Sequence, residues 1–481
     1  MALDLILAEL HQPLPSGEAR QQRLYRLLRA AILDRRLSAG QRLPASRQLA
    51  ADYRMARNSV LFAYQRLLSE GFLETDRGGT RVAALPAIAE AMPLLSMPGP
   101  VLSQRAATLP ANGIAEDLLP FAPGIADVNA FPWPVWSRFL QQAWREVSAR
   151  QLAYAEPGGE PELRRALATF LRRQRGVICE PGQIFIVAGG QVALDACARL
   201  LADAGNRVWL ESPGYRAARN TMLAAGLQIV DVPVDGDGMA APVTLWQDKP
   251  PRLIYLTPAH QYPLGSVLSL ERRLDFLNRL QAGEHWLIED DYDSDFNHAQ
   301  PGARPLPAIQ GLRPEAPVIY VGTFSKLLYP GLRIAYMVVP RWAVASFGAA
   351  IAALYRGGQA VEQRALARFI DSGRLTRHTR AMAPRYRQRQ QVLRRAIQAG
   401  LGDSTVILGG QAGLHLTVLL PDARSDVLLT ADAADQGIAV RALSAYFPSA
   451  AAKNGLVLGY GMAEAERIPQ LVQRLLTALE K

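Results

Sequence analysis

From residue 121 to the C-terminus, short runs of β-branched and apolar residues alternate with segments of helical periodicity. Strands that alternate with helices in this way pair into a mostly parallel sheet with helices on both faces. The sequence therefore predicts a doubly wound α/β domain over residues 121–481. The expected strands cover residues 184–188, 207–210, 228–232, 253–256, 286–289, 318–321 and 334–338.

The first 82 residues follow a different pattern, with two short strands around Gly78 and Gly79 after a helical region. Ser46 is expected to cap the second of three helices. Helix, helix, turn, helix and hairpin, in this order, are typical of a winged helix-turn-helix. Residues 83–120, with frequent Ala and Pro and weak periodicity, are expected to be a linker. The expected helices cover residues 24–37, 47–52 and 57–69.

Positive charge is concentrated in this N-terminal segment. Residues 1–85 contain thirteen arginines, no lysine and eight acidic residues, which gives half of the chain's net charge of +10. A small basic domain suits a polyanion such as DNA. A merely solvated basic surface would have the same composition, so charge alone leaves both interpretations open.

Polar residues at the start of the third helix are candidates for reading DNA bases. This helix would enter the major groove with its N-terminus, where Arg57, Asn58 and Ser59 lie. Arginine can bridge O6 and N7 of guanine, and asparagine can bridge N6 and N7 of adenine. Arg47, one helix earlier, and Arg77, at the hairpin tip, are placed to contact phosphate or the minor groove. An isolated Arg-Asn pair is usually an ordinary helix start, but the surrounding pattern favours DNA contact.

Residues 24–82 resemble the GntR-type winged helix, with matches in LPASRQLA at 43–50 and AYQRLLSEGFL at 63–73. This resemblance covers the whole small domain and implies that two copies bind two half-sites of double-stranded promoter DNA. The residues that it implies to face the DNA are Arg47, Arg57, Asn58, Arg77 and Gly78.

Lysine is rare in this chain, with four residues against 49 arginines. Only a lysine amine can lose its proton and condense with an aldehyde, because a guanidinium stays protonated. Lys249, Lys453 and Lys481 lie in polar or terminal contexts, whereas Lys326 lies between apolar segments. Lys326 is therefore the candidate for a Schiff base.

Three other groups of residues follow expected strands. Gly190 and Gln191 begin a helix, whose N-terminal N–H groups could bind a phosphate. Asp290 could hold a pyridinium nitrogen protonated, and the phenol of Tyr292 could contact a cofactor's 3-oxygen. Tyr215 offers an aromatic face to a flat ring. Each signal is weak alone, since glycine turns are common and an acidic cluster is equally typical of a metal site or a solvated turn.

Thr323, Ser325 and Arg333 flank Lys326 in the sequence and offer hydrogen-bond donors to a phosphate. The carboxyl ends of parallel strands meet at one edge of a sheet, so all of these residues could converge on one crevice. That convergence predicts a site for pyridoxal 5'-phosphate (PLP).

Residues 121–481 resemble the fold type I PLP enzymes of the aspartate aminotransferase superfamily, which adds a smaller α+β subdomain to the expected sheet. Together with the winged helix, the whole chain resembles the MocR/GabR family of regulators. The matches are YLTPAHQYP at 255–263, DDYDSDF at 290–296 and GTFSK at 322–326.

The resemblance implies a PLP aldimine on Lys326, with Asp290 at the pyridine nitrogen, Tyr292 at the 3-oxygen and Tyr215 against the ring. It implies a head-to-tail homodimer in which Tyr154 reaches the site of the partner subunit. The phosphate-binding residues that it implies are Gly190, Gln191, Thr323 and Arg333.

By this resemblance the chain is a PLP-dependent transcription regulator, in which PLP at Lys326 or a small amine effector modulates promoter binding. One alternative is a catalytically active aminotransferase with an autoregulatory DNA-binding domain, and another is a DNA-binding protein whose second domain is a scaffold without cofactor. An amino-acid-processing member has an arginine for the substrate carboxylate near the last strand, and residues 452–460 contain none. Ala217 and Leu264 depart from the family pattern as well. The sequence thus favours regulation over turnover, and PLP itself is a candidate effector.

Composition argues against several other classes of protein. No apolar run approaches the roughly 20 residues that cross a bilayer, and Asp4 and Glu9 stand where a signal peptide is cationic or apolar. Cys179 and Cys197, the two cysteines, form no metal-ligand cluster and fit a reducing compartment. We expect a cytoplasmic protein without a membrane segment or a metal site.

Overall fold

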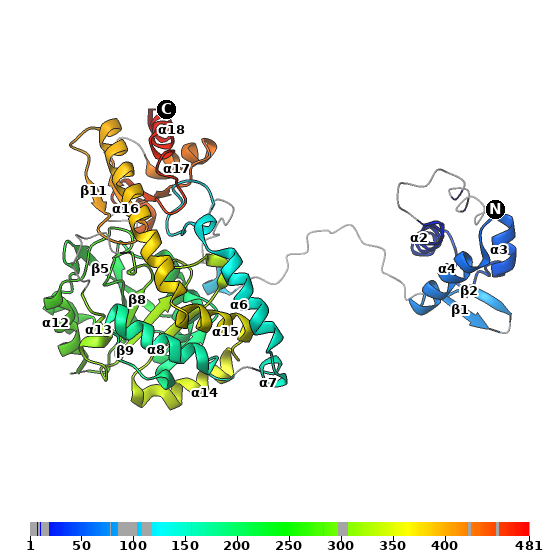
Figure 1. Cartoon of the computed structure of the whole chain (residues 1–481), viewed down its shortest axis with the longest axis horizontal. Helices are drawn as coiled ribbons and strands as arrows, with labels where there is room; N and C mark the ends of the chain where they lie inside the picture. Colours follow the sequence, from blue (N-terminus) through cyan, green and yellow to red (C-terminus); the bar gives the residue numbers. More distant parts are fainter. Residues whose placement is uncertain are drawn as a thin grey trace. The chain divides into compact units, whose positions relative to one another are not determined.

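The chain forms two compact units, Met1–Val101 and Leu102–Lys481, in the computed structural model (Figure 1). Arg77 and most of the expected linker, residues 83–120, lie outside the described residues. Besides Leu7 and Leu10, the structure describes residues 19–76, 78–84, 103–107, 118–154, 156–281, 283–296, 306–421, 425–448 and 452–480.

The first unit is a winged helix-turn-helix, as the sequence predicts. Its helices are α2 (Arg20–Leu33), α3 (Ser46–Asp52) and α4 (Arg57–Ser69), and β1 (Leu73–Asp76) pairs antiparallel with β2 (Gly79–Val82) as the wing. Apolar side chains spaced three or four residues apart put one face of each long helix into a common core. In α2 and α4 these buried residues are Leu24, Leu27, Leu28, Ala31, Ile32, Val60, Ala63, Tyr64 and Leu67.

Two details of this unit differ from the sequence prediction. Helix α2 begins at Arg20 rather than at residue 24, because its polar first turn carries no apolar signal. It ends at Leu33, and Arg35 shortly afterwards has the left-handed φ of 57° that ends a helix. The prediction that Ser46 caps α3 is wrong: Ser46 is the first helical residue, Ala45 is the N-cap, and no side-chain capping bond forms.

The second unit contains an eight-stranded, mostly parallel sheet in the order β3-β10-β9-β8-β7-β4-β5-β6. Strands β4, β5, β7, β8 and β9 pair in parallel, while β10 pairs antiparallel with both β3 and β9. The doubly wound prediction is therefore confirmed. The strands are β3 (Ile184–Val187), β4 (Arg207–Ser212), β5 (Gln228–Asp235), β6 (Gly238–Met239), β7 (Leu253–Leu256), β8 (Trp286–Asp291), β9 (Val318–Thr323) and β10 (Ala335–Val338).

Helices cover both faces of this sheet, so most of its strands are buried on both sides. On one face, α9 (Gly190–Leu201), α10 (Arg216–Ala224) and α14 (Val344–Leu354) pack in one apolar cluster. The other face is covered by α6 (Trp133–Arg145), α8 (Pro161–Arg175), α12 (Leu270–Gln281), α13 (Ile309–Leu312) and α15 (Ala360–Asp371). Shorter helices are α5 (Gln104–Ala107), α7 (Ala149–Leu152) and α11 (Val243–Asp248).

A smaller subdomain follows, built on a four-stranded antiparallel sheet in the order β11-β12-β14-β13. The long helix α16 (Arg374–Leu401) leads from the large sheet into it, and α17 (Asp426–Asp435) and α18 (Ile468–Glu480) pack with it (Figure 1). Its strands are β11 (Ile407–Gly409), β12 (His415–Leu419), β13 (Arg441–Ala442) and β14 (Gly455–Gly459). Across the described residues, every helix is too short or too polar to span a lipid bilayer.

Candidate functional site

The carboxyl ends of the parallel strands open onto a cavity of about 330 Å³. Residues that follow β3, β4, β7, β8 and β9 contribute its walls, because parallel pairing brings all these ends to one edge of the sheet. Most of the residues that the sequence assigned to a cofactor lie here together. They are Gly190, Gln191, Tyr215, Asp290, Tyr292, Thr323, Ser325, Lys326 and Arg333.

Lys326 extends into this cavity from the segment after β9. Its amine donates a hydrogen bond to the carbonyl oxygen of Gly124. A side chain at position 124 would bring its Cβ to 3.0 Å from the lysine Nζ, and Gly124 has a left-handed φ of 74°. The segment around Gly124 therefore closes over the lysine and fits only glycine at this point.

Asp290 provides a carboxylate on the neighbouring strand β8. Its Oδ2 accepts a hydrogen bond of 2.7 Å from the hydroxyl of Tyr255 on β7, which pairs with Ile288, two residues before Asp290 on β8. Burial raises the pKa of Asp290 to about 7, while the Tyr255 hydrogen bond and the positive charge of Lys326 oppose that rise. A ligand that brings a positive charge to this carboxylate would therefore stabilise its ionised form.

Aromatic side chains form another wall of the cavity. The Tyr292 hydroxyl donates to the carbonyl oxygen of His260 at 2.8 Å. The rings of Tyr215 and Tyr262 meet edge to face at 5.8 Å, and the Tyr262 hydroxyl lies 3.0 Å from that of Tyr446. These contacts hold a set of flat faces and hydroxyl groups beside the lysine.

One part of the cavity, the anion end, offers hydrogen-bond donors and a guanidinium that can bind an anion. The N-terminus of α9 contributes Gly190 and Gln191, and unpaired N–H groups at a helix start attract negative charge. The guanidinium of Arg333 lies against the backbone of Gly189, with Nη2 at 3.4 Å from the Ala188 carbonyl oxygen.

Replacing Gly189 with alanine is expected to weaken phosphate binding at this end by about tenfold or more, since strained non-glycine conformations cost about 1–3 kcal/mol. Gly189 has a φ of 99°, and an added Cβ would lie 2.7 Å from Arg333 Nη2. Titration of the apoprotein with PLP measures the effect. Gly182→Ala is the matched control, because its Cβ would meet nothing within 4 Å.

The structure does not bring Tyr154 into this cavity of the same chain. Its side chain is 81% exposed, and its ring lies 5.0 Å from the guanidinium of Arg356 in a separate shallow depression. The expectation that Tyr154 reaches a partner subunit therefore stays a prediction.

Several wall residues were not identified from the sequence. Tyr255 and Thr257 lie at the end of β7, and Thr257 donates to the buried carboxylate of Glu211 at 2.5 Å. Gly124 comes from a segment far from the sheet in sequence. A polar residue directly after a buried apolar strand was the available signal for Thr257, but no local pattern marked Gly124.

The departures noted in the sequence persist in three dimensions. Among the described residues that line the cavity, Arg333 is the arginine, and it lies at the anion end. Strand β14 consists of buried apolar and glycine residues, whereas an amino-acid-processing relative has an arginine for the substrate carboxylate near this strand. Two other arginines that could replace the missing one, Arg219 and Arg441, are not among the residues that line the cavity: Arg219 forms an ion pair with Asp231, and Arg441 pairs in register with Val457 on β14.

In the first unit, the candidate DNA-reading residues lie on exposed positions. Arg57 and Asn58 are exposed at the start of α4, Ser59 is half-buried, and Arg47 is exposed on α3. In the wing, the Gly78 N–H donates to Asp76 Oδ1 at 2.6 Å. Arg42, which no sequence pattern marked, lies between α2 and α3 and is exposed. It places its guanidinium against the turn of the wing, 3.3 Å from an added Cβ at Gly78 or Gly79.

Comparison with known families divides the chain in the same way. The model of aminotransferase class I and II matches residues 129–450, and the model of bacterial regulatory proteins of the gntR family matches residues 20–82. The aminotransferase match therefore spans about two thirds of the chain, including the whole cavity wall from Gly190 to Arg333.

Relatives share both parts. The probable rhizopine catabolism regulatory protein MocR of Rhizobium meliloti is 37% identical over 95% of this chain and 93% of its own length. The HTH-type pyridoxine biosynthesis transcriptional regulator PdxR of Corynebacterium glutamicum is 33% identical, over 95% of this chain and 94% of its own. Among solved structures, the α-aminoadipate aminotransferase LysN of Thermus thermophilus, complexed with N-(5'-phosphopyridoxyl)-L-leucine, superposes with a TM-score of 0.71. It is 25% identical and covers 79% of this chain and 97% of its own.

Proposed function

The chain belongs to the family of HTH-type regulators that join a gntR-type DNA-binding domain to an aminotransferase class I and II domain, and from this membership we propose that it is a PLP-dependent transcription regulator. Residues 1–82 bind double-stranded promoter DNA. Residues 121–481 bind PLP and form a homodimer. PLP, or an amine that binds beside it, alters the affinity for the promoter.

The observation that carries this proposal is the convergence of an amine, a carboxylate and an anion site in one cavity. PLP has an aldehyde, a pyridine nitrogen and a phosphate, and it supplies an aldehyde carbon to which an amine can bond. Lys326 holds the aldehyde carbon, and Asp290 holds the pyridine nitrogen. The α9 N-terminus, Thr323, Ser325 and Arg333 hold the phosphate. Tyr215 and Tyr292 contact the ring and its 3-oxygen.

The proposed dimer is a head-to-tail arrangement in which Tyr154 completes the cavity of the partner subunit. The exposure of Tyr154, outside the cavity of its own chain, supports this assignment. Tyrosine is enriched in protein–protein interfaces, so an exposed Tyr154 suits this role.

The chemistry of the cavity favours an effector without a carboxylate, and PLP itself is the simplest one. A carboxylate needs a partner such as a bidentate arginine, and the described lining residues place their arginine at the anion end. The relative from Corynebacterium glutamicum is by name a regulator of pyridoxine biosynthesis, which supports a vitamin B6 compound as the signal here.

The decisive measurement is the affinity of the full chain for the DNA upstream of its own gene, with and without PLP. We expect PLP to change that affinity by about 5- to 150-fold, the usual range of allosteric coupling. A ligand shifts an equilibrium only if it binds the two states unequally. Identical footprints and affinities for apoprotein, PLP-loaded protein and protein with candidate amines would refute the proposal.

The alternative is a working aminotransferase whose DNA-binding domain regulates its own synthesis. The apolar surface of β14 argues against it, since it offers no arginine for a substrate carboxylate. Accumulation of pyridoxamine phosphate when the loaded protein is mixed with amines would favour this alternative instead.

A further inference from the structure

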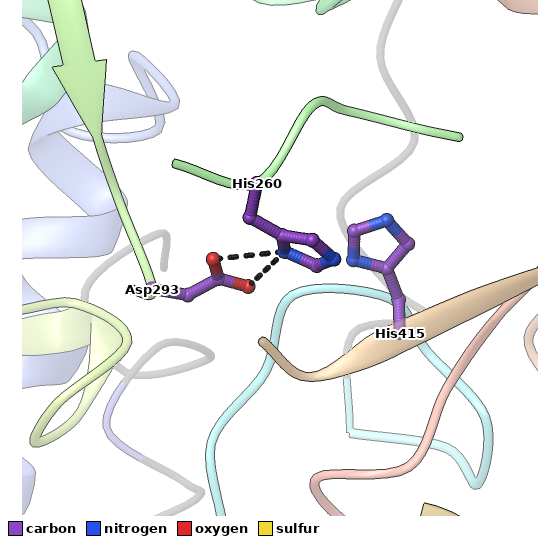
Figure 2. A group of neighbouring side chains, drawn as sticks. All are labelled: His260, Asp293 and His415. Carbon is purple, nitrogen blue, oxygen red and sulfur yellow. Dashed lines mark hydrogen bonds and ion pairs between the residues drawn. The ribbon is translucent and has the colours of Figure 1, made fainter. Parts of the chain in front are cut away.

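Three buried side chains meet where the smaller subdomain contacts the large sheet: His260, Asp293 and His415 (Figure 2). His260 lies in the loop after β7, Asp293 follows β8, and His415 is the first residue of β12. Each of the three is at most 2% exposed. The two imidazole rings lie 4.6 Å apart between centroids, at an angle of 40°.

Hydrogen bonds determine which ring nitrogens carry a hydrogen. His260 Nδ1 lies 3.0 and 3.2 Å from the two carboxylate oxygens of Asp293, and His415 Nε2 lies 3.1 Å from the carbonyl oxygen of Pro263. Carbonyl and carboxylate oxygens accept hydrogen bonds, so both of these nitrogens must donate. In neutral rings, His260 Nε2 and His415 Nδ1 then carry no hydrogen and each has a free lone pair.

These two lone pairs are buried beside each other. Figure 2 shows His260 Nε2 directed toward the ring of His415 and His415 Nδ1 on the side that faces His260. Neither nitrogen has a hydrogen-bond partner among the described residues. Two unpaired acceptors side by side at a buried position are unfavourable, and a proton held between them would satisfy both.

We propose that the two histidines share one proton, which links the smaller subdomain to the loops that carry the cofactor site. The proton resides on His260 Nε2 and is donated to His415 Nδ1. The imidazolium so formed is neutralised by the carboxylate of Asp293. No covalent bond between heavy atoms forms or breaks; the trio takes up one proton from water.

The surrounding groups are consistent with a single proton. Burial and the neighbouring His260 hold the pKa of His415 well below its ordinary value, so the trio resists a second proton. Burial also raises the pKa of Tyr292, which adjoins Asp293 and contacts His260, so this phenol stays neutral. The other titratable groups that interact with the trio are Lys326, Asp290, Asp295, Tyr262 and Tyr460.

A metal ion fits this place less well than a proton. The two histidines offer two free nitrogens, half of a tetrahedral shell, because Asp293 already accepts from His260 Nδ1. Glycine backbone packs closely around the ring of His260: an added Cβ at Gly413 would lie 2.2 Å from its Nδ1, and one at Gly265 would lie 3.2 Å from its Nε2. The 330 Å³ cavity is lined by neither histidine.

The trio lies where the smaller subdomain meets the loops of the cavity, so the shared proton affects how these two parts are held together. The backbone N–H of Leu414 donates to Asp293 Oδ2 at 3.2 Å, so the start of β12 is held to the loop after β8. Tyr292, next in sequence to Asp293, lines the cavity and donates to the His260 carbonyl oxygen. The proton therefore holds the smaller subdomain in place beside the cavity. An effect of this proton on PLP binding rests on the proposed function, whereas the contact between the subdomain and the loops does not.

The test is urea unfolding of the full chain across pH 6.5–9, without PLP and again with saturating PLP. An unfolded histidine has a pKa of about 6.5, so above that pH the native trio holds one proton more than the unfolded chain. The native trio loses this contribution as pH rises through its own higher pKa. Within that window the unfolding constant of the wild type should rise by about tenfold per pH unit relative to His415→Gln. This variant keeps a donor for Pro263 but loses Nδ1.

His285→Asn is the matched control, because its Nδ1 donates to the Pro251 carbonyl oxygen away from the trio and asparagine retains that donor. Equal pH slopes for the wild type and His415→Gln, with and without PLP, would overturn the shared proton. So would one equivalent of a transition metal in the purified wild type that is lost in His415→Gln. A pH slope that differs as expected while PLP binding is absent would sustain the link and refute only the cofactor assignment.

A second measurement does not depend on any variant folding. Deuterium exchange at the imidazole carbon, followed by mass spectrometry of the wild type, reports the pKa of each histidine separately. We expect exchange at His415 to show a pKa below its ordinary value, because burial and the neighbouring His260 lower it. An ordinary pKa for His415 would contradict the proposal.

Discussion

Replacing Lys326 with alanine is expected to abolish the Schiff-base absorption band of the PLP-loaded protein, leaving at most the band of the PLP aldehyde itself, and to abolish the adduct formed with borohydride. The reason is chemical: a Schiff base needs a primary amine, and a guanidinium stays protonated at any pH that a protein tolerates. Among the described residues, Lys326 is the lysine that lines the cavity. Absorption spectra and peptide mass analysis after borohydride treatment measure the loss, which should be complete rather than partial.

Two matched variants make this result specific. Lys326→Arg keeps the positive charge beside Asp290 but cannot form the bond, so it should also lack the Schiff-base band and the borohydride adduct while binding PLP reversibly. Lys249→Ala removes a lysine outside the cavity and should leave the spectrum unchanged. An adduct at another lysine in the wild type, or a colourless wild type that binds no PLP, would leave the second domain as a scaffold without cofactor.

The same variants separate the cofactor from its regulatory role. If PLP acts through covalent attachment, promoter affinity in Lys326→Ala should no longer respond to added PLP, whereas Lys249→Ala should respond like the wild type. A response that survives in Lys326→Ala would assign the signal to reversible binding in the anion end, where Arg333 and the α9 N-terminus remain intact.

Much of this site could be predicted because its chemistry follows buried strands. Asp290, Tyr292, Thr323 and Lys326 each lie at the end of an apolar run or within a few residues of it, and parallel pairing then forces their convergence. Burial on both faces made these runs continuous in sequence. Site residues could therefore be predicted where a chemically suitable residue stood at the end of a predicted strand.

Other parts of the site depend on contacts that no local pattern records. Gly124 meets Lys326 across 202 positions of chain. His260 and Asp293 lie within the predicted motifs, but their meeting with His415 depends on how the smaller subdomain packs on the large sheet. Ser46 illustrates a local failure: serine has a capping preference, yet the preceding alanine adopts the extended φ and ψ, so the serine becomes helical.

In the first unit, Arg57→Ala is expected to weaken binding to the chain's own upstream DNA by about tenfold to a hundredfold, since one bidentate base contact contributes about 1–3 kcal/mol. Its affinity for unrelated DNA should change much less. Arg57 is exposed in the first turn of α4, where a recognition helix reaches base edges. Equilibrium binding to both DNAs at one salt concentration measures the ratio.

Two further arginines separate base reading from simple charge. Arg47→Ala removes a candidate phosphate contact on α3, so it should weaken binding to all sequences alike and reduce the salt slope by about 0.9. Arg66 lies at the other end of α4, where it pairs with Glu70 at 3.1 Å and packs over the Tyr25 ring, so Arg66→Ala should leave the ratio between specific and unrelated DNA unchanged. If Arg57→Ala weakened both DNAs equally, as Arg47→Ala should, then α4 would hold phosphate rather than read sequence. Another element of the winged helix would then contact the bases, and the wing and Arg42 would be tested next.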